Sequence, residues 1–187
     1  YEKAGVAGLF IEDQVFPKRC GHMEGKDVIP VDDMLAKIRA ACSAREDEDL
    51  VIMARTDALA VHGLDEAIRR GILYAEAGAD LIFVEAVRSR DEMGLVNREI
   101  PKPTLANMIE GGKTPILSAG ELEQLGYNVV VYPCSLTYAV TKAAQTCMEV
   151  LKTTGTTEGC MGDMLMFDDF FRFIGAEDIR KKEKTFY

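Results

Sequence analysis

The feature that most constrains the fold is a regular alternation of short apolar runs with longer helical patterns. Five runs are apolar, often β-branched, and end in polar residues: Val6–Ile11, Leu50–Ala54, Ala79–Val84, Thr104–Met108 and Asn128–Tyr132. The other patterns predict helices over Asp32–Cys42, Leu64–Ala77, Arg90–Asn97, Ser118–Leu125 and Ser135–Thr153. Such alternation is typical of right-handed β-α-β units, so the sequence predicts an α/β fold with an all-parallel sheet.

An internal repeat supports this interpretation. Tyr1–Glu12 aligns without a gap on Tyr74–Glu85, and each copy has the order helix end, glycine, strand, glutamate. Gly5 and Gly78 fall where the end of a helix needs a positive φ angle. The chain thus opens inside a helix that has no preceding strand to pack it, and we expect N-terminal sequence to be missing.

The composition bounds the class of protein. With 187 residues and 48% hydrophobic content, the chain can bury the core of a single domain over 1–187. The net charge of −9 and scattered basic residues argue against binding to nucleic acid or to anionic lipid. No apolar run approaches the ~18 residues of a membrane span and no leader pattern opens the chain, so we expect a cytoplasmic protein without a membrane segment.

The cysteines are odd in number and contain no Cys-x-x-Cys pair, which argues against a disulfide framework or a structural zinc site. They are Cys20, Cys42, Cys134, Cys147 and Cys160. Cys20 differs from the others because Lys18, Arg19 and His22 surround it in the sequence, and positive neighbours favour a reactive thiolate. The alternative is an inert loop thiol.

Polar residues gather where the predicted strands end, which is where α/β barrels place their active sites. They are Glu12, Asp13, Gln14, Arg55, Thr56, Asp57, Glu85, Asn107, Glu110 and Ser135, and Pro133 also stands at the end of the fifth strand. Acids, an arginine and an amide on one rim suit a metal ion and a carboxylate substrate. Each acid alone could instead cap a helix or pair inside the rim.

The loop over residues 15–25 follows the first predicted strand and contains Cys20. Gly21 and Gly25 give it hinge-like freedom, so we expect it to close over substrate and bring Cys20 to the reacting carbon as an acid or a base.

Several motifs together are similar to those of the isocitrate lyase / phosphoenolpyruvate mutase superfamily, over essentially the whole chain. They are Lys18-Arg-Cys-Gly-His22 shortly after Ile11–Gln14, then Met53–Ala58, Phe83–Glu85, Leu105–Pro115 and Tyr132-Pro133. The 2-methylisocitrate lyase and 2,3-dimethylmalate lyase branch is the most similar. The combination is specific, whereas each motif alone is not.

The resemblance implies a partial (β/α)8 TIM barrel comprising roughly the last five β/α units plus C-terminal helices. It also implies a homotetramer in which residues 156–187 form a C-terminal packing segment, and the aromatic cluster Phe167–Phe173 suits such a contact.

For chemistry, the resemblance implies a lyase dependent on Mg²⁺ (or Mn²⁺) that cleaves a 2-hydroxy di- or tricarboxylate into a 2-oxo acid and a second carboxylate. Cys20 would exchange a proton with the carbanionic carbon, Glu12 would lie near the metal through water, and His22 and Arg55 would assist catalysis. The implied substrate-binding residues are Lys18, Arg19, Gly21, Arg55, Glu85, Asn107, Ile109 and Ser135.

Two departures from the family pattern leave the activity open. Tyr138 stands where the 2-methylisocitrate lyases have an arginine, which favours a smaller dicarboxylate, and so a relative of 2,3-dimethylmalate lyase or an oxaloacetate hydrolase or decarboxylase, over a tricarboxylate lyase. The family's metal-binding aspartates belong to first strands that this chain lacks, so we expect the chain alone to be inactive. Two further hypotheses are a carboxyphosphonoenolpyruvate mutase-like enzyme, against which Cys20 counts, and a non-catalytic barrel fragment.

Overall fold

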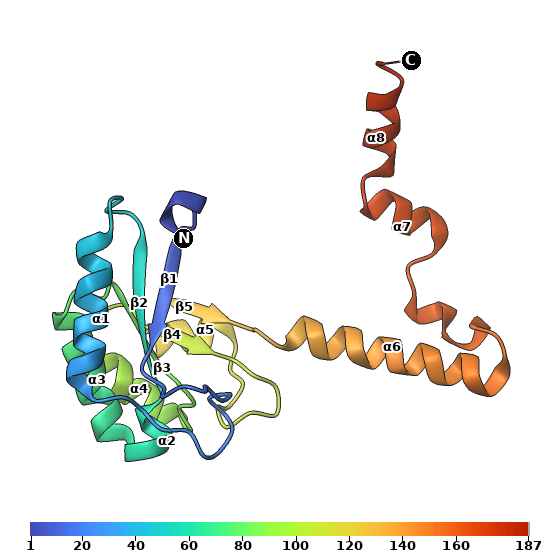
Figure 1. The fold of residues 1–187 in the computed structure, drawn as a ribbon. Helices are drawn as coiled ribbons and strands as arrows, with labels where there is room; N and C mark the ends of the chain where they lie inside the picture. Colours follow the sequence, from blue (N-terminus) through green and yellow to red (C-terminus); the bar gives the residue numbers. More distant parts are fainter. Residues whose placement is uncertain (187) are drawn as a thin grey trace. The chain divides into compact units, whose positions relative to one another are not determined.

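A computed structural model describes residues 1–186 of the chain. These residues form two compact units, one spanning Tyr1–Cys134 and one that begins at Ser135 (Figure 1). The prediction of one domain over 1–187, with a packing segment over 156–187, stays a prediction.

The first unit is built on five short parallel strands. Strands β1 (Gly8–Glu12), β2 (Val51–Thr56) and β3 (Leu81–Val84) pair in that order, and β4 (Leu105–Asn107) pairs with β5 (Val129–Val131). A parallel bridge between Ile82 and Thr104 links the two groups. The structure confirms an α/β fold with parallel strands, and closure into a barrel stays a prediction.

Helices lie along one side of these strands (Figure 1). After the 3-10 turn η1 (Glu2–Ala4) they are α1 (Val31–Ala44), α2 (Ala58–His62), α3 (Leu64–Glu76), α4 (Arg90–Glu99) and α5 (Ala119–Gln124). All except α2 match predicted helices to within two residues at each end. The sequence missed α2 because five residues are too short to show a helical period.

Alternation along the strands separates the core from the rim. On β2 the side chains of Ile52, Ala54 and Thr56 are buried, and the first two belong to the apolar interior. That interior contains Met34, Ile38, Tyr74, Ile82 and Met93. Met53 and Arg55 lie between them in sequence and line a pocket instead. Because successive side chains on a strand point to opposite faces, the same strands form the core and present the pocket.

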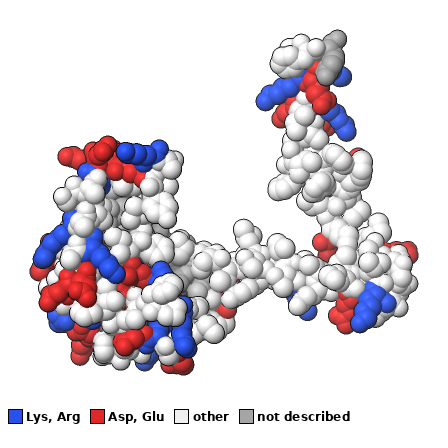
Figure 2. All heavy atoms as spheres, in the orientation of Figure 1, with Lys and Arg blue, Asp and Glu red and all other residues white. Residues whose placement is uncertain are grey.

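The second unit contains α6 (Ser135–Thr154), η2 (Glu158–Asp163), α7 (Phe167–Phe173) and α8 (Ala176–Glu183). Cys160 is buried where η2 packs on α6, but Leu136, Phe167 and Phe173 are 81%, 74% and 79% exposed. Figure 2 shows largely uncharged surface over α6 and α7 and charges of both signs on α8. No helix among residues 1–186 has the length and apolarity needed to cross a membrane.

Candidate active site

A pocket of about 500 Å³ lies at the carboxyl ends of the strands in the first unit. The strands and the residues just after them contribute Phe10, Glu12, Met53, Arg55, Phe83, Glu85, Leu105, Asn107, Ile109, Val131, Pro133 and Cys134. The loop after β1 contributes Lys18, Arg19, Cys20 and Gly21. Every catalytic or substrate-binding residue that the resemblance implied therefore lines this pocket except His22 and Ser135. Five other residues expected at the strand ends do not line it: Asp13, Gln14, Thr56, Asp57 and Glu110. Ser135 is the first residue of α6 in the second unit, and its substrate-binding role stays a prediction.

Arg55 is held in the pocket wall by acids on both sides. Its Nε donates to Asp57 Oδ2 at 2.9 Å, its Nη2 donates to Asp57 Oδ1 at 3.3 Å, and Nη2 lies 3.6 Å from Glu85 Oε1. The guanidinium also stacks 5.0 Å from the centre of the Phe83 ring. Burial lowers the pKa of Arg55, but the hydrogen bond to Asp57 and the charges of Glu85, Asp57 and Glu12 raise it by more. A fixed, permanently charged arginine in a pocket wall suits a carboxylate ligand.

Glu85 is the central acid of the site, and its side chain is 2% exposed. Asn107 Nδ2 donates to both of its oxygens, at 3.2 and 3.4 Å. The next residue, Ala86, has a φ of 60°, in a region that residues with a side chain seldom adopt. Such a strained turn directly after β3 fits a position where a side chain must be aimed at a site. Asn107 Oδ1 is buried and accepts no hydrogen bond from residues 1–186.

His22 faces Glu85, and it is not among the residues that line the pocket. Its Nδ1 accepts a hydrogen bond from the Lys113 backbone N–H at 2.8 Å, so the ring proton is on Nε2. Nε2 lies 3.2 Å from Glu85 Oε1 without being aligned for a hydrogen bond. Burial lowers the pKa of His22; the charge of Glu85 opposes this shift, while Lys26, Arg55 and Lys113 add to it. His22 is therefore neutral near pH 7 and adds no positive charge beside Cys20.

Cys20 is exposed and lines the pocket. The backbone before it is fixed by Gln14, whose Oε1 accepts from the Arg19 N–H at 2.8 Å and whose Nε2 donates to the Arg19 carbonyl at 2.9 Å. The amide of Gln14 thus imitates a strand partner for the loop, a role that the sequence did not reveal. The positive charge near the thiol comes from Lys18 and Arg19, which also line the pocket.

Glu12 ends β1 with its side chain 8% exposed, and Lys18 Nζ donates to it at 3.0 Å. Glu12 lines the pocket, and its carboxylate oxygens are of the kind that bind metal ions. Among residues 1–186 no three His, Cys, Asp or Glu side chains are grouped so that they could hold a metal ion.

Asp13 lies beneath the rim and pairs inside it, which is one of the two structural roles expected for a strand-end acid. It is fully buried, and its carboxylate accepts from Thr56 Oγ1 at 2.7 Å, Tyr74 OH at 2.8 Å and Arg70 Nη1 at 3.1 Å. Burial and the negative charge of Asp13 together raise the pKa of Tyr74. The network ties β1 to β2 and α3, so it supports the site from below.

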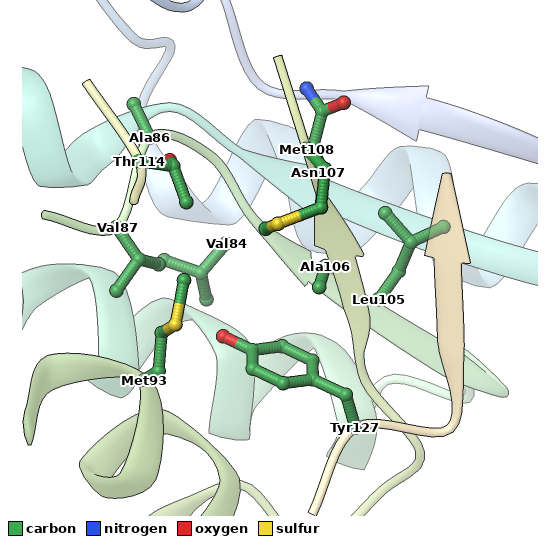
Figure 3. A pocket seen from close by; sticks show the side chains of 10 residues that line it. All are labelled: Val84, Ala86, Val87, Met93, Leu105, Ala106, Asn107, Met108, Thr114 and Tyr127. Atoms are coloured by element: carbon green, nitrogen blue, oxygen red, sulfur yellow. The ribbon is translucent and has the colours of Figure 1, made fainter. Parts of the chain in front are cut away.

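A second, much smaller cavity of about 10 Å³ lies between α4, β3 and β4 (Figure 3). Its wall is mainly apolar, with Val84, Met93, Met108 and the Tyr127 ring around it, and Asn107 at one side. It has room for about one water molecule. The cavity therefore belongs to the packing beneath the site, and the larger rim pocket is the candidate binding site.

Comparison with known proteins gives a consistent picture. Residues 1–152 match the family model described as phosphoenolpyruvate phosphomutase. The 2,3-dimethylmalate lyase of Eubacterium barkeri is 48% identical over 186 residues, which cover 100% of this chain and 64% of that protein. The 2-methylisocitrate lyase of Aeropyrum pernix is 41% identical over 182 residues, covering 97% of this chain and 58% of that protein. The chain therefore spans about three fifths of the length of these relatives.

Two solved structures are similar to nearly the whole of this chain. A crystal structure of 2,3-dimethylmalate lyase, described as a PEP mutase/isocitrate lyase superfamily member, matches with a TM-score of 0.88 and 35% identity, covering 99% of this chain and 62% of that one. A phosphonopyruvate hydrolase in complex with oxalate and Mg²⁺ matches with a TM-score of 0.80 and 27% identity, covering 98% of this chain and 64% of that one.

Proposed function

Because the chain belongs to the phosphoenolpyruvate mutase/isocitrate lyase superfamily, we propose that it is the larger part of a carbon–carbon lyase. Its substrate would be a 2-hydroxy di- or tricarboxylate of the 2,3-dimethylmalate or 2-methylisocitrate type. The observation that carries the proposal is the convergence of Cys20, Arg55, Glu85 and Asn107 on one pocket at the strand ends. The 48% identity to a 2,3-dimethylmalate lyase over the whole chain supports it.

Each residue has a role that its chemistry supports. Arg55 pairs with a substrate carboxylate, and Lys18 and Arg19 add positive charge from the loop. Asn107 and Glu85 orient the polar groups of the substrate. When a base takes the proton of the substrate hydroxyl, the bond between the carbinol carbon and its neighbour breaks and leaves a 2-oxo acid and an enolate. The Cys20 thiol donates a proton to the enolate carbon, and the thiolate that remains is stabilised by the cations of the loop.

The residues present fit a magnesium or manganese ion only in part. Glu12 is the carboxylate in the pocket that would hold it, through a water molecule, since Mg²⁺ keeps several of its waters. Asn107, which also lines the pocket, has a side-chain oxygen that accepts no hydrogen bond from residues 1–186. Direct aspartate ligands would have to come from sequence outside this chain. When bound, such an ion supplies positive charge that stabilises the enolate.

A second candidate function is the hydrolysis of oxaloacetate to oxalate and acetate. Tyr138, at the position where the tricarboxylate enzymes have an arginine, supports it over cleavage of a tricarboxylate, because one fewer guanidinium suits one fewer carboxylate; 2,3-dimethylmalate, also a dicarboxylate, is supported equally.

The test is product release from 2,3-dimethylmalate, 2-methylisocitrate, isocitrate and oxaloacetate with Mg²⁺, measuring 2-oxo acid and oxalate separately. It compares the chain as given, the chain completed at its N-terminus to the length of its relatives, and the completed chain with Cys20→Ser. Cys42→Ser, at a half-buried cysteine outside the pocket, is the matched control.

We expect activity in the completed chain, its loss in Cys20→Ser and its retention in Cys42→Ser. Oxalate release alone would establish the hydrolase instead. No product from any substrate would refute both the lyase and the hydrolase and leave the mutase-like enzyme or the non-catalytic fragment.

We also propose that the protein assembles as a homotetramer through its C-terminal helices. The support is the exposed aromatic surface of α7, where Phe167 and Phe173 would otherwise remain in water. Sedimentation equilibrium should give four chains per particle, and a double change of Phe167 and Phe173 to serine should reduce that number.

A further inference from the structure

Lys26 is a buried lysine that neither the motifs nor the pocket explains. Its side chain is only 2% exposed, although it lies near the end of the loop that contains Cys20. Lysine is seldom buried unless its ammonium group is paired, because removing the charge from water is costly. The contacts of this ammonium group therefore indicate the role of Lys26.

The contacts of Lys26 join the loop to the rim of the sheet. Its Nζ donates to the Gly21 carbonyl and to the Met23 carbonyl, the latter at 3.2 Å. The same Nζ lies 3.8 Å from Asp57 Oδ1, and the Asp57 side chain is 0% exposed. Asp57 in turn is the acid that holds Arg55 with two hydrogen bonds. One ammonium group thus touches the loop backbone next to Cys20 and the acid that fixes Arg55.

We propose that Lys26 is a positioning residue that holds the loop of Cys20 closed on the rim. The catalytic consequence rests on the proposed lyase function, whereas the structural consequence does not. Lys26 does not line the pocket, so it acts through Gly21, His22 and Asp57 and not on the substrate.

The geometry explains why the loop needs such a support. Gly21 packs directly on Glu85, and His22 faces the same carboxylate at 3.2 Å. The peptide group between these two residues contributes the Gly21 carbonyl that Lys26 binds. Without that donor, a buried carbonyl and a buried acid both lose a partner, and the loop gains freedom to lift from the rim.

The charge of Lys26 has a second effect, on His22. The charged groups that face His22 are Glu85 after β3, Arg55 on β2, Lys113 in the segment after β4, and Lys26 in its own loop. Of these, Glu85 favours the protonated ring and the three cations oppose it. Removing the charge of Lys26 should therefore raise the pKa of His22, an effect that a purely structural lysine at a distance would not have.

The first experiment measures the His22 pKa by NMR and needs no turnover, so its failure is distinguishable from a failure of the proposed function. The chain has two histidines, and His62→Gln leaves His22 as the single reporter. In this background Lys26→Met keeps the side-chain length and removes the charge, and Lys26→Arg keeps the charge. Lys37→Met, at an exposed lysine on α1, is the matched control.

We expect the His22 pKa to rise in Lys26→Met and to stay at the parent value in Lys26→Arg and Lys37→Met. In the completed chain we expect Lys26→Met to lower kcat by about 10- to 100-fold, as for a catalytic group displaced by about 1 Å, with KM changed much less. An unchanged His22 pKa in folded Lys26→Met would overturn the proposal. Equal losses in kcat and in substrate affinity would overturn the positioning role.

A measurement on the unaltered chain covers the case in which Lys26→Met does not fold. Acylation of the lysine amines, followed by mass spectrometry, ranks them by accessibility. Lys26 should react at least about tenfold more slowly than Lys37, because reaction requires the loop to open first. Equal rates would show a free ammonium group and overturn the proposal without any variant.

Discussion

Replacing Gly21 by alanine would put a methyl group into space that Glu85 occupies. An ideal Cβ at Gly21 would lie 2.2 Å from Glu85 Oε1, 2.3 Å from its Cγ and 2.5 Å from its Cδ. Ordinary contacts of a Cβ begin at 3.4 Å, so the loop and the carboxylate must separate by about 1 Å or more. The φ angle of Gly21 is not in the left-handed region, so the backbone conformation does not require glycine here. Glycine is needed because a side chain would not fit between the loop and Glu85.

Glu85 has little freedom to yield. Its side chain is 2% exposed and is held by Asn107 at 3.2 Å, with His22 at 3.2 Å and Arg55 at 3.6 Å around it. The loop must then lift and carry Cys20 with it. For a displacement of about 1 Å we expect a loss of about 100-fold in kcat/KM, equal to about 2.7 kcal/mol of transition-state stabilisation. Where Glu85 moves instead, overpacking should cost about 1–3 kcal/mol of folding stability.

The assay is 2-oxo acid release by the completed chain, together with urea unfolding of the same protein. Gly120→Ala is the control, because a Cβ on Gly120 meets nothing within 4 Å and the residue lies inside α5. This control should retain full activity and be as stable as the parent or up to about 1 kcal/mol more stable. A Gly21→Ala protein that retains activity within twofold, at unchanged stability, would refute the close packing of this loop on Glu85.

Three further predictions concern groups around the site. Asp13→Ala should cost about 3–5 kcal/mol in urea unfolding, because it removes the buried acceptor shared by Arg70, Tyr74 and Thr56 and leaves the Arg70 guanidinium paired only with the part-exposed Glu66; a loss below about 1 kcal/mol would contradict the network. The His22 pKa is held below the ordinary value of 6.5, so thermal stability should be full above pH 6.5 and fall as the pH drops below it. In His22→Asn the melting temperature should fall less as the pH drops. An equal fall in the parent and the variant would disprove this contribution of His22. Arg55→Lys removes the paired hydrogen bonds to Asp57 and should lower kcat/KM by at least about tenfold, with equal activity counting against a bidentate role.

The sequence predicted the strands and the long helices because their apolar side chains repeat with the period of the structure they form. It ended the first two strands one or two residues early, at Ile11 and Ala54, where the side chains become polar. Backbone pairing does not depend on side-chain polarity and continues through Glu12 and Arg55, which are partners across β1 and β2. The end of such a strand is set by its pairing with the neighbouring strand, so the side-chain pattern does not predict it.

The site followed from the sequence as far as strand topology determines it. Parallel strands bring their carboxyl ends to one edge, which is why Glu12, Arg55, Glu85 and Asn107 were expected on one rim and line one pocket. The path of the loop after β1 was not predictable, because it depends on contacts between residues far apart in sequence. The bond from Lys113 to His22, across a separation of 91 residues, is one such contact. It turns His22 toward Glu85, so that the ring does not supply the positive charge that its place in the sequence suggested.

The two copies of the internal repeat have similar sequences, but their glutamates have different surroundings. Gly5 and Gly78 both adopt a positive φ, and both copies lead through a strand to a glutamate, as the alignment predicted. Yet Tyr74 is fully buried and donates to Asp13, whereas Tyr1 is 90% exposed. The repeat thus fixes the backbone and the direction in which each strand carries its glutamate. The neighbours then decide the role: Glu12 meets a half-exposed lysine, and Glu85 meets Arg55, His22 and Asn107 in a buried cluster. Glu85 is thus held by several buried partners, with Arg55 as the cation, whereas Glu12 pairs with a half-exposed lysine in a weaker, solvated contact.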